Sequence, residues 1–248
     1  KYKYSFRLSG HVGYWASDAA AILDQIKEKF NFDKLYVSSS DAAHTVAAAK
    51  AIKELAVERG WQVVGEETHP MGSTDYAALM RDCTNSGAQV LFWWDCKPEV
   101  GIGIKQWHDM QVPAILFGFL NPLDEATAWT SMDGKVVSAI QFNGEGGCLP
   151  DSNLTPITKD FFDAFVAKYD DEPRGCGNVP TYTALYALKE AFEKAGSRDA
   201  DKVVAALEEM EMVTTGGLLK FDPTNHQALY GTDPDEALVG QWLQWQDG

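Results

Sequence analysis

Basic residues are scarce in this sequence. Its 248 residues include 21 Lys and Arg against 36 Asp and Glu, which gives a formal net charge of −15. A field of that sign repels a phosphate backbone, so the composition excludes a nucleic-acid binder that works by neutralising phosphates. Hydrophobic residues make up 45% of the chain, which is typical of a folded protein with a core and excludes a disordered one.

Long apolar runs are also missing. A membrane-spanning helix needs about 20 predominantly apolar residues in a row. No stretch of the sequence approaches that length, so we expect a soluble protein. The chain starts at Lys1 without Met and without a charged-then-apolar leader, as expected of a processed or truncated protein in which any export signal is already gone. This end of the sequence alone neither shows nor excludes export.

Cysteines are few. Cys83, Cys96, Cys148 and Cys176 are the only ones, and no two of them form a CxxC pair. This excludes a disulfide-rich scaffold and a zinc site of the usual spacing. Cys148 and Cys176 lie in Gly- and Pro-rich segments, where a disulfide could form in an oxidising compartment; two separate thiols are the alternative.

Motifs of the common enzyme classes are missing as well. The sequence has no GxSxG, no HExxH, no P-loop and no complete GxGxxG, because Gly101-Ile102-Gly103 lacks a third glycine and falls in a helical pattern. The histidines are not spaced as metal ligands, and the acidic residues are spread over helix faces, as on a solvated surface. We therefore expect no catalytic residue, no metal and no cofactor, and predict that the protein is not an enzyme.

Strand-like runs do recur along the first part of the chain. They begin at Leu35, Gln62, Val90, Ala114 and Val136. Between them, apolar residues repeat every three or four positions, as in 15–30 and 46–56, which predicts amphipathic helices. Strands that alternate with helices form parallel sheets, because parallel neighbours need a crossover connection. Residues 1–142 therefore predict an α/β domain with a mainly parallel sheet flanked by helices.

Capping residues agree with this pattern. Asp41 and Thr74 are expected to cap the second and third helices, and Pro98 suits the first turn of the fourth. Gly60 and Gly87 are expected to end the second and third helices.

After residue 142 the strand–helix repeat stops. A Gly-, Pro- and Asn-rich segment over 143–156 is the expected connection to a second domain. The rest predicts three helices, at 158–169, 181–195 and 199–210, and two short strands, at 218–221 and 240–246. These elements lack a sheet of their own to cover, so we expect a domain whose other strands are missing.

Several short motifs follow one another along nearly the whole chain. They are Phe6-Arg7, Gly65-Glu66-Glu67, Thr74-Asp75-Tyr76, Phe162-Asp163-Ala164-Phe165, Tyr182-Thr183-Ala184-Leu185, Phe221-Asp222-Pro223 and Gln244-Trp245-Gln246-Asp247-Gly248. None is specific alone, but their order and spacing resemble the type I periplasmic solute-binding proteins of ABC importers, of the branched-chain-amino-acid (Leu/Ile/Val) type.

The resemblance implies a fold of two lobes, each with a mainly parallel sheet flanked by helices. Residues 1–142 would form lobe two, with the first crossover strand at 1–10. Residues 143–248 would return to lobe one, with a further crossover near 218–245. The front part of lobe one would be absent, so that a missing N-terminal segment or a partner chain would complete it.

The resemblance also implies a function. The protein would be exported to the periplasm, capture a small organic solute in a cleft between the lobes by hinge closure, and deliver it to an ABC transporter permease. The solute would be an amino acid or a small carboxylate, and no nucleic acid would bind. A ligand-sensing domain of a receptor or regulator with the same fold is one alternative, and a flavodoxin-like enzyme domain is another.

Ligands of open α/β sheets bind beyond the carboxyl ends of the strands, near helix N-termini. This rule selects three clusters of candidate ligand contacts: Ser40, Asp41 and His44; Trp94, Asp95 and Cys96; and Phe119 and Leu120. Structural roles are the alternatives for several of these residues. Ser40 or Asp41 could simply cap a helix, His44 could be a surface histidine, and Trp93 and Trp94 could both belong to the core. Since the two tryptophans alternate across a strand, we expect Trp94 to approach the cleft.

The resemblance adds positions to this set. Ala43 aligns with an aromatic ligand contact of the family, as do Cys96 and Lys97 on their loop. Asn178, before the helix that contains Tyr182, corresponds to a contact loop of lobe one.

Leu120 stands where amino-acid-binding members carry the acidic residue that pairs with the ammonium group of the ligand. Its apolar side chain predicts a ligand other than an ordinary α-amino acid, such as an aromatic or short carboxylic acid or an amide, unless Asp95 or Asp41 takes over that role.

Overall fold

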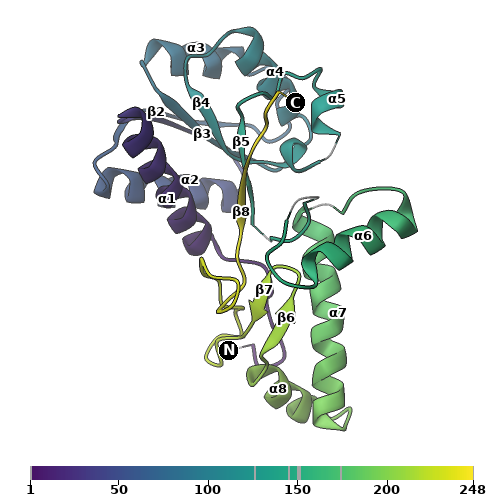
Figure 1. Ribbon diagram of the computed structural model, residues 1–248. Coiled ribbons are helices and arrows are strands. Elements are labelled where there is room, and N and C mark those ends of the chain that lie inside the picture. Colours follow the sequence, from purple (N-terminus) through teal and green to yellow (C-terminus); the bar gives the residue numbers. More distant parts are fainter. Residues whose placement is uncertain (1, 126, 145, 150–151, 174, 248) are drawn as a thin grey trace. The chain divides into compact units, whose positions relative to one another are not determined.

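The computed structural model describes residues 2–125, 127–144, 146–149, 152–173 and 175–247, without the side chains of residues 175 and 176. The chain forms two compact units (Figure 1). The sheet domain consists of His11–Phe142 with Trp242–Gly248, and the helical domain consists of Lys1–Gly10 with Asn143–Gln241. The chain therefore passes from one unit to the other three times.

A six-stranded sheet forms the centre of the sheet domain (Figure 1). Its strands are β1 (Lys34–Ser40), β2 (Gln62–His69), β3 (Val90–Asp95), β4 (Ile115–Leu120), β5 (Ile140–Asn143) and β8 (Gln241–Gln244). They lie in the order β2-β1-β3-β4-β5-β8, and the pairs from β2 to β5 are all parallel. The prediction of an α/β fold with a mainly parallel sheet is thus confirmed.

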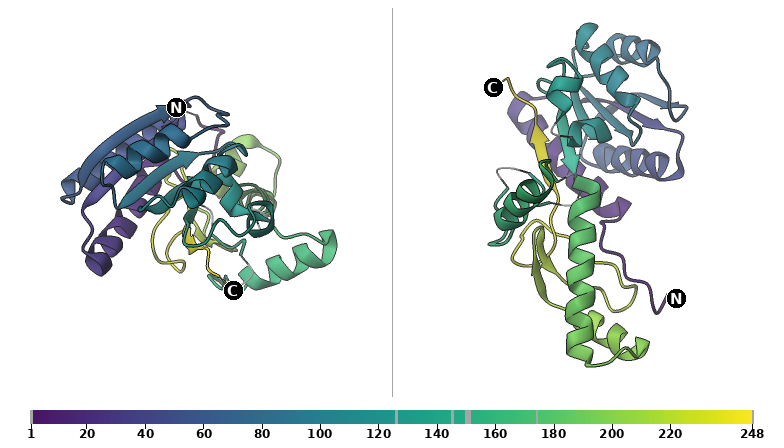
Figure 2. Two further views of the ribbon diagram at one scale, coloured as in Figure 1. Left: turned by 90° about the horizontal axis from the view of Figure 1, so that it is seen from above. Right: turned by 90° about the vertical axis from the view of Figure 1, so that its right-hand side faces the viewer.

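Helices cover both faces of this sheet (Figure 2). The apolar faces of α1 (Val12–Phe30) and α2 (Ala43–Glu58) pack on one side with Phe92, Trp94 and Phe117. On the other side, α3 (Ala77–Asn85), α4 (Val100–Asp109), η1 (Asn121–Asp124) and α5 (Ala128–Ser131) pack around Trp93. Since successive side chains of a strand point to opposite faces, β3 supplies both cores and carries no polar face.

The last strand of the predicted repeat was placed wrongly. Val136 and Val137 lie in consecutive turns, and β5 begins only at Ile140. Gly134 and Ser138 both have positive φ, and the Ala139 N–H donates to the Val136 carbonyl at 3.0 Å, which closes a turn. Val136 packs into the core from a turn, because burial of a side chain does not require a strand, while Val137 is only partly buried.

Two predicted helix caps are also wrong. Ala42 precedes α2 and makes no side-chain cap, while Asp41 accepts the Met71 N–H instead. At α3 it is Asp75, not Thr74, that accepts the Ala77 N–H. The glycines after these helices, Gly60 and Gly87, do adopt the positive φ expected of helix ends.

The helical domain contains the three helices expected from the sequence. They are α6 (Thr158–Tyr169), α7 (Gly175–Ala195) and α8 (Ala200–Glu208), and Figure 2 shows α7 as a long helix with α8 beside its C-terminal end. Asp199 caps α8 by accepting the N–H groups of Asp201 and Lys202. The strands β6 (Met212–Thr214) and β7 (Gly217–Leu219) form a two-stranded antiparallel sheet. This sheet is too small to cover the apolar faces of the three helices.

The first residues of the chain belong to the helical domain. Arg7 forms a bridge with Gln227, and Phe6 stacks on His226 with ring centroids 4.0 Å apart. The described residues 2–10 lie with the helical domain, and residues 242–247 lie with the sheet domain. The predicted crossovers at 1–10 and near 218–245 fall in the parts of the chain where it passes between the two units.

Candidate functional site

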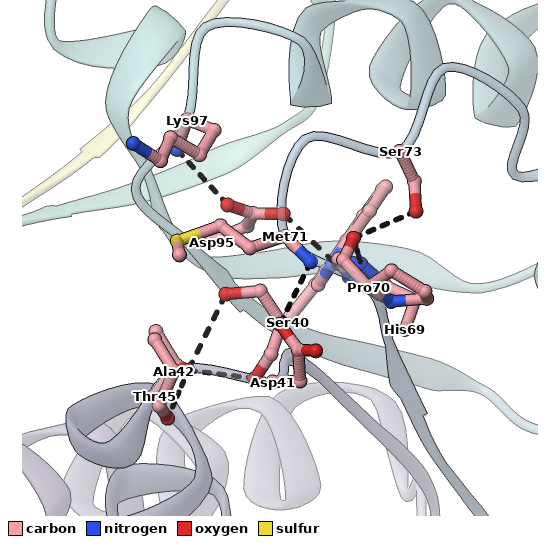
Figure 3. A network of polar contacts seen from close by, with 11 residues as sticks. Ser40, Asp41, Ala42, Thr45, His69, Pro70, Met71, Ser73, Asp95 and Lys97 are labelled. Carbon is pink, nitrogen blue, oxygen red and sulfur yellow. Dashed lines mark hydrogen bonds and ion pairs between the residues drawn. The ribbon is translucent and has the colours of Figure 1, made fainter.

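The carboxyl ends of the parallel strands bring polar side chains together (Figure 3). Because β2, β1, β3 and β4 are parallel neighbours, their last residues share one edge of the sheet. These residues are His69, Ser40, Asp95 and Leu120. We call this region the carboxyl edge of the sheet domain.

Asp41 links two strand ends at this edge (Figure 3). Its N–H donates to the His69 carbonyl at 2.9 Å, and its Oδ1 accepts the Met71 N–H at 2.8 Å. The side chain is exposed to solvent. Asp41 therefore presents an exposed carboxylate, one oxygen of which accepts a backbone N–H, on a loop that a backbone–backbone hydrogen bond also holds.

Ser40 has a structural role instead of an accessible one. It is 1% exposed, and its Oγ lies 3.3 Å from the Thr45 Oγ1. The Thr45 hydroxyl in turn lies 2.7 Å from the Ser40 carbonyl and 2.8 Å from the Ala42 carbonyl. These contacts connect the end of β1 to the first turn of α2, so the prediction that Ser40 contacts a ligand is not supported by its burial.

His69 is a buried member of the edge that the sequence analysis missed. The Trp93 Nε1–H, which can only donate, lies 2.8 Å from His69 Nε2. Nε2 must therefore accept, which leaves the proton of the neutral ring on Nδ1, 3.3 Å from the Pro70 carbonyl. His69 could have been identified from the sequence by its position at the end of β2, next to β1.

Asp95 lies next to this histidine at the end of β3. Its side chain is 0% exposed; Oδ1 accepts the Lys97 N–H at 2.9 Å, while Oδ2 lies 3.6 Å from His69 Nε2 and has no hydrogen-bond partner among the described residues. Burial raises the pKa of the Asp95 carboxyl above its usual value. Asp95 is thus a buried carboxyl group with a raised pKa, and it is not accessible to the ammonium group of a ligand.

The raised pKa of Asp95 leads to a prediction about how stability depends on pH. Because the folded domain binds this proton more tightly than the unfolded chain, the contribution of Asp95 to stability is fully present below the ordinary carboxyl pKa and is lost as pH rises through the folded pKa. The Asp95→Asn variant cannot titrate and can keep the hydrogen bond to Lys97 N–H. We expect its free energy of unfolding, relative to the unmodified protein, to increase with pH in urea denaturation followed by circular dichroism.

Asp75→Asn is the matched control. Asp75 is exposed, and the hydrogen bond from the Ala77 N–H lowers its pKa, so its contribution is present above the ordinary carboxyl pKa and is lost as pH falls. The two variants should therefore diverge in opposite directions with pH. A relative stability of Asp95→Asn that does not change with pH would contradict the raised pKa of Asp95.

Three apolar candidates of the sequence analysis lie in the core. Trp94 is 2% exposed and packs against Phe119 and Trp15, with ring centroids 5.1 and 5.7 Å away. Leu120 is fully buried on the opposite face, with Trp93. The prediction that Trp94 approaches the cleft is wrong, because helices cover both faces of β3. Phe119 and Leu120 are likewise packed against neighbouring side chains and do not line a surface that a ligand could contact.

The accessible candidates at the carboxyl edge are Asp41, Ala43, His44 and Cys96. Ala43 and His44 are exposed in the first turn of α2, and Cys96 is half-buried after β3. His44 Nε2 lies 3.3 Å from Cys96 Sγ. The Asn121 amide donates to the Cys96 carbonyl at 2.8 Å, which ties this loop to the end of β4. The edge thus offers a carboxylate and a thiol–imidazole pair to solvent.

Asn178 belongs to the helical domain. It lies inside α7, where a contact loop had been expected, and it lines a hollow of about 720 Å³. Aromatic side chains of α6 and α7 form much of this hollow: Phe161, Phe165, Tyr169, Tyr182 and Tyr186. The predicted disulfide between Cys148 and Cys176 lies outside the described residues, because the side chain of Cys176 is not among them.

Among the described residues, none of the helices combines the length and the apolar character that a membrane span requires. Within the same residues, no three His, Cys, Asp or Glu side chains gather in a way that could hold a metal ion.

Comparison with known families gives a match over most of the chain. Residues 1–232 match the family model described as periplasmic binding protein. A leucine-, isoleucine-, valine-, threonine- and alanine-binding protein of Pseudomonas aeruginosa is 26% identical over 201 residues, covering 79% of this chain and 51% of that protein. Leu/Ile/Val-binding protein homolog 3 of Brucella melitensis is 25% identical over 221 residues, covering 88% and 57%. The chain thus spans about half the length of these curated relatives.

Solved structures share the fold. A leucine-binding protein of Thermotoga maritima superposes with a TM-score of 0.78 at 16% identity, covering 94% of this chain and 63% of that one. A solute-binding protein of an ABC transporter from R. palustris, solved in complex with benzoate, gives a TM-score of 0.77 at 14% identity, with coverage of 90% and 59%.

Proposed function

We propose that this chain, which belongs to the periplasmic binding protein family, acts outside the cytoplasm as a solute-binding protein and delivers a small organic solute to the permease of an ABC transporter. The type I fold and the kinship with Leu/Ile/Val-binding proteins support a role in binding. Binding proteins of this kind perform no covalent chemistry on the solute. The permease and the periplasmic location are inferred from the family.

The contacts that we propose come from the accessible residues of each domain. In the sheet domain these are Asp41, Ala43, His44 and Cys96 at the carboxyl edge, next to the N-terminus of α2. In the helical domain Asn178 is the proposed contact. The observation that carries the proposal is this accessible edge, since exposed polar groups at the carboxyl ends of parallel strands are where open α/β sheets bind ligands.

The proposed solute is a small carboxylic acid, with aromatic acids included. Leu120 supplies no carboxylate, and Asp95 is buried with one oxygen bound to the Lys97 N–H, so neither can pair with the ammonium group of an amino acid. The relative from Pseudomonas aeruginosa is named for amino acids, whereas the R. palustris protein was solved with benzoate. The burial of Asp95 and Leu120 favours the second chemistry for this chain. Asp41 is the remaining accessible carboxylate among the candidates.

The hollow of the helical domain supports a further part of the proposal. Tyr169, Leu185, Tyr186 and Val213 line it and are exposed, although apolar surfaces of this extent are normally covered. The domain has only a two-stranded sheet, and the chain spans about half of its curated relatives. We propose that the remainder of lobe one, supplied by a preceding segment or by a partner chain, packs on this surface.

A thermal-shift screen tests the proposed function. The protein is produced at 248 residues and also with any residues that its gene encodes before or after them. Each form is screened against aliphatic amino acids, benzoate-type acids and short aliphatic acids. A solute at a hundred times its Kd stabilises by about 2.7 kcal/mol, which raises Tm by about 5–10 °C in a protein of this size. We expect acids to give this shift in the form with a complete lobe one.

Asp41→Asn distinguishes the two ligand classes. If the solute is an acid, removing this nearby negative charge should keep or increase the shift. If only amino acids stabilise the protein, and Asp41→Asn abolishes their effect, then Asp41 pairs with the ammonium group and the proposed acid class is wrong. A complete lobe one without a shift from either class would contradict the proposed function.

A further inference from the structure

The thiol–imidazole pair at the carboxyl edge goes beyond solute binding. His44 Nε2 and Cys96 Sγ are 3.3 Å apart, and the two residues come from neighbouring strand ends, since His44 follows β1 and Cys96 follows β3. A thiol within hydrogen-bond reach of an imidazole can transfer its proton to the ring, which leaves a thiolate beside an imidazolium. We propose that this pair makes Cys96 a nucleophilic cysteine that exchanges with small disulfides.

The backbone holds the pair in place. The Cys96 carbonyl accepts the Asn121 amide at 2.8 Å, and the next N–H, that of Lys97, donates to Asp95 Oδ1 at 2.9 Å. On the other side, His44 lies in the first turn of α2, where the unpaired N–H groups of a helix favour negative charge nearby. The backbone of the Cys96 loop is therefore held beside the first turn of α2, where His44 lies.

The imidazole of His44 is the group that stabilises a thiolate at Cys96, because its Nε2 lies 3.3 Å from the sulfur. The other charged groups on the adjoining segments are Asp41, Asp95, Lys97, Glu99 and Asp124. Asp41, Asp95 and Asp124 accept hydrogen bonds from the Met71 N–H, the Lys97 N–H and the Gln141 amide, which leave a carboxylate its negative charge. Those carboxylates oppose a thiolate and Lys97 favours one, so His44 must supply most of its stabilisation.

The other described thiols offer no comparable site. Cys83 is fully buried in the core, and desolvation raises the pKa of its thiol to about 12. Cys148 is 3% exposed, and its sulfur lies 2.8 Å from the Asn143 amide. Cys96 is half-buried and accessible, as a reactive cysteine must be.

The exchange balances without a further oxidant. The Cys96 thiol gives its proton to His44 Nε2, and the thiolate attacks one sulfur of a disulfide R–S–S–R. The Cys96–S–S–R bond forms as the S–S bond of the reagent breaks, and RS⁻ leaves with the electron pair. The imidazolium or water returns the proton to RS⁻. Cys96 is oxidised, the departing sulfur is reduced, and the ligand class is a low-molecular-weight disulfide.

Reaction with 4,4′-dithiodipyridine tests the proposal on the whole chain. This neutral disulfide is not repelled by the net charge of the protein, and its released thiopyridone is read by absorbance, while mass spectrometry identifies the modified cysteine. We expect a fast phase located at Cys96 that is lost in Cys96→Ser. His44→Gln should slow it about three- to tenfold below neutral pH and move its pH profile to higher pH, because a higher thiol pKa costs thiolate but returns some nucleophilicity.

His108→Gln is the matched control, since His108 is an exposed histidine beside Asp109 and is not paired with a thiol by any contact in the described residues. It should leave the fast phase and its pH profile unchanged. A fast phase that persists in Cys96→Ser, or a His44→Gln variant with the rate and pH profile of the unmodified protein, would overturn the proposal. The assay contains no transported solute, so its failure leaves the proposed function standing, and an empty solute screen leaves the reactivity of Cys96 standing.

Discussion

Trp94→Ala is expected to lower the free energy of unfolding by about 3–5 kcal/mol, the usual cost of emptying the site of a buried tryptophan. The side chain is 2% exposed and is enclosed by Trp15, Phe92 and Phe119, whose positions on α1, β3 and β4 limit how far the cavity can collapse. Urea denaturation followed by far-ultraviolet circular dichroism measures the loss without relying on tryptophan fluorescence.

Trp94→Phe separates packing from ligand binding. The Nε1–H of Trp94 is buried without a hydrogen-bond partner among the described residues, so phenylalanine removes an unsatisfied donor while it keeps an aromatic ring in the site. We expect this variant to lose less than half as much stability as Trp94→Ala. If Trp94→Ala instead unfolded at the same urea concentration as the unmodified protein and lost only its response to solutes, Trp94 would be a ligand contact and not a core residue.

Gly118→Ala is expected to destabilise the sheet domain by about 3 kcal/mol, at the upper end of overpacking effects. Gly118 lies opposite Trp93 in the register of β3 and β4, and an added Cβ would overlap the Trp93 carbonyl oxygen. Backbone atoms of a central sheet cannot turn aside as the end of a side chain can. The two strands would have to separate, which also disturbs the ends of β3 and β4 at the carboxyl edge.

Gly101→Ala provides the matched comparison for this change. In α4 the nearest atom to an added Cβ is the Met132 sulfur at 3.7 Å, an ordinary contact distance. Alanine is a better helix former than glycine, so this variant should gain about 0.5 kcal/mol. Equal stabilities of the two variants in the same denaturation assay would show that the sheet tolerates the added methyl group and that β3 and β4 are less closely packed than the structure indicates.

The sequence predicted the elements whose signals are local. The helix over 158–169 is found with the expected bounds, and Gly60 and Gly87 end their helices as predicted. The hydrophobic period of a helix and the glycine that ends it depend on residues within one or two turns of the chain, so both can be predicted from the sequence. The family was also identified correctly, from the order and spacing of several short motifs that are not specific alone.

Features that depend on distant residues were harder to predict. Asp41 can cap a helix by local rules, but the Met71 N–H from the end of β2 takes its carboxylate. Trp94 alternates with Trp93 as expected, but only the tertiary structure shows that α1 and α2 cover its face. His69 and the contact between His44 and Cys96 depend on which strands are neighbours, which a strand-by-strand analysis does not give.

The position of β8 has a consequence for synthesis. This strand completes the sheet beside β5, yet it is separated from β5 by nearly the whole helical domain in the chain. Trp242, near its start, stacks on Phe117, packs at a tilt against Phe142, and donates to Asp18 at 2.7 Å. While a ribosome makes this protein, the backbone edge of β5 therefore stays unpaired until residues 241–244 have emerged. The nascent sheet domain is open to edge-to-edge association during that interval, and holding the chain unfolded until β8 has been made would avoid it.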